Sequence, residues 1–218
     1  MNIAAYGFAI WETFYVTVLS TAFALVLGLP LGVLLVAGDK DGILPLPSWL
    51  MHLINIVINI LRSVPFLILM ICVFPLTRAI VGTTVGTKAT IVPLVVAAFP
   101  FVARLVETSL RELDEGVVEA AQSMGATPFQ IITKVMIPEC LPGLISSMTT
   151  ALTTILGYSA MSGVIGGGGL GKIALSYGYY RYQTDIMIVC VILLVLMVQV
   201  FQTLGTAWAT RSDKRLRK

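Results

Sequence analysis

Charged residues are scarce in this chain of 218 residues. Asp, Glu, Lys and Arg make up 11% of it, against a hydrophobic fraction of 57%. Soluble domains are closer to about half apolar and a quarter charged. The composition therefore argues against an ordinary soluble domain and indicates a protein embedded in a lipid bilayer. The formal net charge of +3 is small, and its cations are dispersed except at the C-terminal end, so nucleic acid is a poor candidate partner.

The residues that usually hold metals or form disulfides are also rare. Cys72, Cys140 and Cys190 stand alone in apolar runs, without the spacing of a metal site or a disulfide framework, and we expect them to be core residues. The N-terminal stretch lacks a basic region and a cleavage site before its first long apolar run. We therefore expect no removable signal peptide.

Enzyme motifs are incomplete. The only histidine, His52, is on a different predicted span from Ser159, so no base is in place to activate that serine in an intramembrane hydrolase. The run GTTVGTK at 82–88 has too few residues between its glycines for a P-loop, and no strand precedes the glycines at 166–171. We expect no ATPase, dinucleotide or metal site on this chain. The glycine run instead predicts a mobile, close-packed loop.

Five stretches approach the roughly 20 apolar residues that a membrane-spanning helix needs. They predict an all-α integral membrane protein with one domain over residues 13–209 and spans at Thr13–Ala37, Trp49–Phe74, Thr90–Leu110, Leu141–Met161 and Ile186–Ala209. Asn55, Asn59, Arg62 and Pro65 interrupt the second span. The third span carries Pro93, Pro100, Arg104 and Glu107. Polar residues at membrane depth are expensive unless they face a bundle interior or a water-filled path, so both helices are expected to line a path or to pack centrally.

Basic residues near the span ends predict the orientation, because cytoplasmic loops carry an excess of Lys and Arg. With the N-terminus outside, nine basic residues lie on the cytoplasmic side and four outside, with Arg62 in mid-span. The C-terminus, with its basic tail at 210–218, and the loop at 112–138 are then cytoplasmic. Within the spans, the glycines of Gly28-Leu29-Pro30-Leu31-Gly32 predict close helix packing rather than substrate contact.

The loop at 112–138 is a polar, amphipathic segment between apolar spans. Asp114 is a candidate N-cap, Gly125 predicts a left-handed helix end, and Thr127 with Pro128 predicts the start of a second short helix. In the first helix, helical spacing places the following apolar residues on one side: Val117, Ala120, Ala121 and Met124. Glu115, Glu119, Gln122 and Ser123 are expected to face water. Such an apolar surface with a charged rim suits docking on another protein.

Glu119-Ala120-Ala121, Gly125 and Val135-x-Ile137-Pro138 resemble the EAA loop of ABC importer membrane subunits in order and spacing. Val135 and Ile137 replace the Ile and Leu of that pattern and keep its apolar character. Further stretches, at 11–13, 28–32, 62–66, 75–83, 124–128 and 157–161, resemble the permease subunits of bacterial methionine importers. Histidine and polar amino-acid importers share parts of this set.

The resemblance implies a type I permease that works as a homodimer in the bacterial inner membrane. Two ATPase subunits in the cytoplasm would bind ATP and Mg²⁺, and a periplasmic lipoprotein would deliver the substrate. The residues implied in coupling are Glu119, Ala120, Ala121, Met124, Gly125 and Pro128. Tyr158, Ser159 and Met161 are candidate gate or pathway residues.

The alternative within the same class is an importer of another amino acid. Two alternatives of other classes are an ion-coupled secondary transporter and a membrane scaffold. An ion-coupled secondary transporter would need buried carboxylates, whereas Glu12, Glu107 and Glu139 all lie near predicted span ends. Arg104, Glu107 and Arg111 stand three and four residues apart, where opposite charges pair on one helix face. This favours a solvated end of the third span over a proton relay. A membrane scaffold that only anchors a partner would move no solute.

Overall fold

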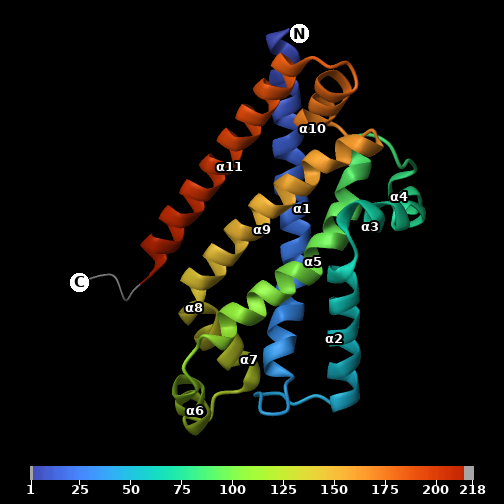
Figure 1. The fold of residues 1–218 in the computed structure, drawn as a ribbon. Helices are drawn as coiled ribbons and strands as arrows, with labels where there is room; N and C mark the ends of the chain where they lie inside the picture. The colour runs from blue at the N-terminus through green and yellow to red at the C-terminus, as the bar shows by residue number, and fades with distance from the viewer. Residues whose placement is uncertain (1, 214–218) are drawn as a thin grey trace.

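The computed structural model describes residues 2–213 as a bundle of long helices with short helices toward both ends (Figure 1). The long helices are α1 (Ile3–Ala37), α2 (Ser48–Ser63), α5 (Thr87–Arg111), α9 (Leu141–Met161) and α11 (Thr184–Ser212). Four of them are long and apolar enough to cross a membrane, and the bent pair of α2 and α3 would make a fifth span. The all-α membrane fold predicted from the sequence is confirmed.

Short helices connect the long ones. Near α2 and α5 these are α3 (Phe66–Cys72) and α4 (Phe74–Val81). Between α5 and α9 they are α6 (Glu115–Ser123), α7 (Pro128–Ile131), the π-helix η1 (Ile132–Met136) and α8 (Ile137–Glu139). Between α9 and α11 they are the 3₁₀-helix η2 (Ser162–Ile165), α10 (Gly169–Ile173) and the π-helix η3 (Ala174–Tyr179). We call the end of the bundle that holds α6 to α8 the EAA end (Figure 1).

The expected second span is not one continuous helix. α2 and α3 meet at an angle of 110°, and Val64 between them has extended backbone angles. The cause is Pro65, because proline disfavours the helical conformation of the residue before it and donates no backbone hydrogen bond. α2 therefore stops partway along the bundle, and α3 continues from there in a sharply different direction (Figure 1).

The first helix also differs from the expectation, since α1 begins at Ile3 rather than Thr13. Nothing in the apolar stretch before Thr13 breaks a helix. Glu12, which directly precedes the predicted span, therefore lies well inside the helix. Pro30 is also inside α1, which continues through it to Ala37.

The core is built on the contact between α1 and α5. A Cβ atom on Gly32 would lie 2.6 Å from the carbonyl oxygen of Ala103, and one on Gly28 would lie 2.8 Å from that of Phe99. These glycines thus allow the two backbones to touch, which confirms the predicted packing role. The α5 residues at the centre, Leu94, Ala98, Val102 and Val106, are fully buried.

The last helix, α11, lies at the edge of the bundle, with only Ile186 and Cys190 buried. Cys140 and Cys190 are buried as predicted, but Cys72 is exposed at the end of α3. The predicted basic tail begins within α11, and its residues 214–218 lie outside the described residues.

Candidate functional site

The loop at 112–138, which we call the EAA segment, begins with two short helices, α6 and α7. They are joined by a turn at Gly125. At the start of α6, Oδ1 of Asp114 accepts a hydrogen bond of 2.8 Å from the backbone N–H of Gly116. At its end, Gly125 has φ of +78°, its N–H donates to Gln122 O at 2.9 Å, and the Ala126 N–H donates to Ala121 O at 3.1 Å. These two bonds form a Schellman motif, which fixes the direction of the chain after the helix. The N-cap and the left-handed glycine predicted from the sequence are confirmed.

The second helix of the segment, α7, begins with a capping box. The Gln130 N–H donates to Thr127 Oγ1, and the Thr127 N–H donates to Oε1 of Gln130 at 2.9 Å. Pro128 occupies the first helical turn, where its missing N–H costs nothing. The predicted positions of Thr127 and Pro128 are thus confirmed. Because both ends of the turn are capped, the angle between α6 and α7 is set by local bonds.

The apolar face predicted for α6 is divided in two. Ala121 is buried and packs against the hydrophobic core, whereas Val117, Ala120 and Met124 are exposed. Met124 is 81% exposed and Phe129, at the start of α7, is 74% exposed. Phe129 was missed in the sequence because it is out of helical register with α6, although a lone aromatic in a polar segment was a usable signal.

Four exposed apolar residues lie on α6, its C-cap and α7, at the EAA end. We call Val117, Ala120, Met124 and Phe129 the apolar knob. Its rim consists of the exposed polar residues that the sequence predicted to face water: Glu115, Glu119, Gln122 and Ser123. On the inner side, Ile131 and Met136 are buried, and Val135 and Ile137 pack against the core. The segment is therefore anchored inward and presents its knob outward.

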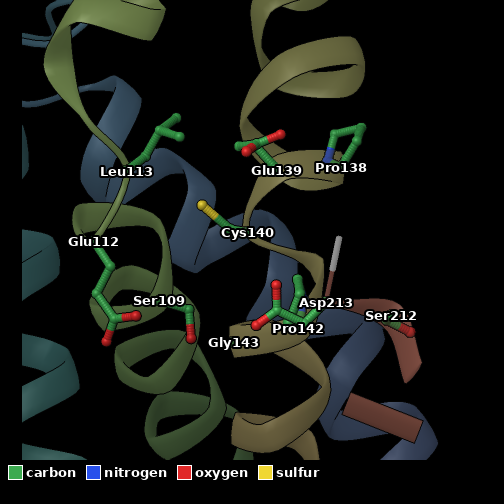
Figure 2. Close-up of a pocket in the computed structure, with 10 residues that line it drawn as sticks. All are labelled: Ser109, Glu112, Leu113, Pro138, Glu139, Cys140, Pro142, Gly143, Ser212 and Asp213. Atoms are coloured by element: carbon green, nitrogen blue, oxygen red, sulfur yellow. The ribbon is translucent and has the colours of Figure 1, made fainter. Parts of the chain in front are cut away.

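A cavity of about 180 Å³ lies behind this segment, where the ends of α5, α8, α9 and α11 converge. Figure 2 shows that its three carboxylates, Glu112, Glu139 and Asp213, come from three separate segments, with the Cys140 side chain close by. Within residues 2–213, no group of three or more His, Cys, Asp or Glu side chains could hold a metal ion. The cavity lies between the EAA segment and the ends of the long helices, and no sequence pattern predicted it.

Arg104 and Arg111 organise a polar cluster between α5, α2 and the loop after α1. Arg104 bonds Glu107 at 2.6 Å and also donates to Oδ1 of Asn55 at 2.6 Å. Arg111 bonds Glu107 at 3.0 Å and Asp39 at 2.9 Å. The hydrogen bond from Arg111 holds the pKa of Asp39 below its usual value. The ion pairing predicted from the spacing is confirmed, but the Arg104–Glu107 pair is largely shielded rather than solvated, because Arg104 also bonds α2.

The candidate gate residues do not form one site. Ser159 is buried, and its hydroxyl donates to Leu156 O within α9 at 2.7 Å. Met161 is 47% exposed at the end of α9. Tyr158 instead faces a hollow of about 200 Å³ at the bend between α2 and α3, which is lined by Leu61, Arg62, Val64, Phe66, Leu69, Ala97, Phe101 and Tyr158. The sequence did not associate Tyr158 with Arg62 because the bend that brings them together was not predicted.

The glycine loop before α10 is bonded to two other helices. Oε2 of Glu12 accepts a hydrogen bond of 2.8 Å from the Gly169 N–H, and Oε1 of Glu12 accepts one from the Thr87 hydroxyl. Thr13 Oγ1 accepts another from the Leu170 N–H at 2.9 Å. The close packing predicted for this loop is confirmed, whereas these bonds argue against the mobility predicted with it. Glu12 is the group that ties α1, α5 and α10 together.

The long apolar helices and the broken span are those of a membrane protein. Residues 24–218 match the family described as "Binding-protein-dependent transport system inner membrane component", and the chain belongs to this family. It is a multi-pass inner-membrane permease component, which is distinct from the ATPase of such a transport system.

Named relatives narrow the comparison. The chain is 51% identical over 208 residues to a probable D-methionine transport system permease protein MetI of Vibrio cholerae, covering 95% of this chain and 92% of the relative. It is 48% identical over 154 residues to the D-methionine transport system permease protein MetI of Escherichia coli K12, covering 71% and 70% of the two chains.

Solved structures agree with this assignment. One of the inward-facing MetNI methionine ABC transporter structures contains a chain that superposes with a TM-score of 0.95 and 42% identity, covering 98% of this chain and all of the other. A chain from an amino acid ABC transporter crystallised with histidines superposes with a TM-score of 0.79 at 18% identity, which shows a shared fold only.

Proposed function

We propose that this chain is the permease subunit of an ATP-driven methionine importer, working with ATPase subunits through its EAA segment. The observation that supports this most is the likeness to the MetNI methionine ABC transporter chain, at a TM-score of 0.95 over 98% of this chain. Relatives of about 50% identity, which match over most of their length, are named as probable D-methionine permeases. An importer of another amino acid is the alternative within the same class.

The coupling role falls on Glu119, Ala120, Ala121, Met124, Gly125 and Pro128. In this proposal the apolar knob inserts into the ATPase. The Schellman turn and the capping box keep the shape of the knob when the ATPase subunits move. Burying a Met or Phe side chain is worth roughly 1.5–3 kcal/mol, so Met124 and Phe129 together can supply much of the docking energy. ATP and Mg²⁺ are bound by the partner ATPase and not by this chain.

A second copy of the chain is proposed to complete the pathway. Only Ile58 of α2 is buried, and its exposed surface includes Asn59, Arg62 and Ser63. Such polar side chains are costly against lipid, so a homodimer in which α2 faces a path between two copies accounts for them better than a monomer. One copy offers one EAA segment, and two copies offer docking points for two ATPase subunits.

The orientation follows the charge distribution. We place the EAA end in the cytoplasm and the glycine loop at the periplasmic surface, where a substrate-binding lipoprotein would deliver methionine. The N-terminus is then periplasmic and the C-terminus cytoplasmic. The candidate gate residues Tyr158, Ser159 and Met161 lie toward the periplasmic end in this orientation.

ATP hydrolysis by the reconstituted complex tests the proposal. The chain, its ATPase and its binding protein are placed in proteoliposomes, and hydrolysis is measured with and without methionine. We expect stimulation by methionine-loaded binding protein, and its loss in a Met124→Ser, Phe129→Ser double variant. Leu44→Ser is the matched control, since Leu44 is also exposed at the EAA end but lies outside the knob. Equal stimulation in the double variant would refute coupling through the knob.

A further inference from the structure

The hollow at the bend between α2 and α3 holds an unneutralised cation. α2 has 16 residues and rises about 24 Å, which is less than the roughly 30 Å thickness of the hydrocarbon core. Arg62, in its last turn, is therefore at membrane depth if α2 starts at the surface. Among residues 2–213 the structure gives Arg62 no hydrogen bond and no ion pair, and no acidic residue lines the hollow.

Arg104 of α5, which packs against α2, provides a comparison with Arg62. It is also an arginine at a span, but it is bonded to Glu107, Asn55 and Asn59. Ionisable residues at membrane depth normally pair with one another or mark a substrate path. Arg104 follows the first pattern. Arg62 has no such partner among residues 2–213, which leaves the second pattern as its explanation.

The walls beside Arg62 are aromatic. The rings of Phe66 and Tyr158 stack with centroids 4.6 Å apart and an interplanar angle of 7°, and Phe101 lines the same hollow. Phe66 is buried, so this wall is held by the core. The volume of about 200 Å³ is below the roughly 300–1,000 Å³ of pockets for drug-sized ligands, which suits a molecule as small as one amino acid.

We propose that this hollow binds the transported amino acid within the membrane, with its carboxylate on Arg62 and its apolar side chain against Phe66, Phe101 and Tyr158. The inference rests on the proposed importer function and adds a site to it. A guanidinium pairs with a carboxylate through two parallel hydrogen bonds. A thioether makes favourable contacts with aromatic rings, so an unbranched, sulfur-containing side chain fits the wall. A cationic side chain would be repelled by Arg62.

A structural role for Arg62 makes a different prediction. A cation in the last turn of a helix interacts favourably with its C-terminus, and lysine would do this as well as arginine. Bidentate carboxylate binding, in contrast, requires the planar guanidinium. Arg62→Lys therefore separates the two roles, and Arg62→Gln removes the charge altogether.

The test is equilibrium binding of radiolabelled methionine to the purified permease–ATPase complex without the binding protein. We expect weak saturable binding to the parent, at least about tenfold weaker binding to Arg62→Gln and to Arg62→Lys, and weaker binding to Phe101→Ala. Norleucine should compete, whereas methioninol, which lacks the carboxylate, should not. Thermal unfolding of each variant checks that it is folded.

Two results would overturn this site. One is parent-like binding by Arg62→Gln or equal competition by methioninol, and the other is absence of saturable binding to a parent complex that still transports methionine. ATP-dependent methionine uptake, measured on the same parent complex with its binding protein, separates this failure from failure of the importer function. If uptake proceeds and binding is insensitive to Arg62, the function stands and the site does not.

Discussion

Gly125 allows the coupling proposal to be tested by a single methyl group. Its φ of +78° lies in the left-handed region, and a Cβ atom placed there would meet no atom within 4 Å. The cost of Gly125→Ala is therefore conformational and not steric, at about 1–2 kcal/mol. If the Schellman turn must form for the knob to dock, this cost lowers the fraction of correctly shaped loop, and ATPase binding with it, by about 5- to 30-fold.

The assay is the affinity of the detergent-solubilised permease for its ATPase, measured alongside thermal unfolding. Gly125→Asn should recover most of the affinity, because asparagine adopts the left-handed conformation more readily than alanine. Gly7→Ala is the matched control, since Gly7 also has open space around it but a normal helical backbone at the opposite end. If Gly125→Ala binds the ATPase as well as Gly7→Ala does, the turn is not required for docking and the reasoning is wrong.

Three further predictions concern the bundle. Gly32→Ala should lower stability by about 1–3 kcal/mol, seen as a lower unfolding midpoint, because its Cβ would lie 2.6 Å from Ala103 O; an unchanged midpoint would contradict the packing. Asp39→Asn should cost at most about 1 kcal/mol, since the Arg111 pair is half exposed. Because Arg111 lowers the pKa of Asp39, the difference in stability between parent and variant should persist above pH of about 4 and vanish as acid protonates the parent carboxyl. A stability difference that is constant at all pH values would refute this prediction. Glu12→Ala should release the glycine loop and speed amide hydrogen exchange at Gly169 and Leu170, and unchanged exchange would show that Glu12 does not hold the loop.

Local signals in the sequence were sufficient for the EAA segment. Asp114, Gly125 and Thr127 each determine a cap or a turn through bonds to neighbours a few residues away, so their type and spacing identify the structure. The close contact at Gly28 and Gly32 was predictable for a similar reason, since small residues at helical spacing mark where helices meet.

Contacts between distant segments were not predictable in this way. The hollow that contains Arg62 and Tyr158 depends on the 110° bend after α2, and the sequence showed only that Pro65 interrupts a span. The role of Glu12 was likewise hidden, because its partners Thr87 and Gly169 are 75 and 157 residues away. Phe129 joins the knob only through the angle between α6 and α7.

The central claim is that this chain moves methionine at the expense of ATP, together with an ATPase and a binding protein. The most direct measurement is uptake of radiolabelled methionine into proteoliposomes that contain all three components, with ATP supplied to the ATPase side. We predict uptake that requires ATP, the ATPase and the binding protein, and that a Gly125→Pro variant loses while remaining folded. Uptake that proceeds without the ATPase, or ATP-driven uptake of other amino acids but not methionine, would contradict the account.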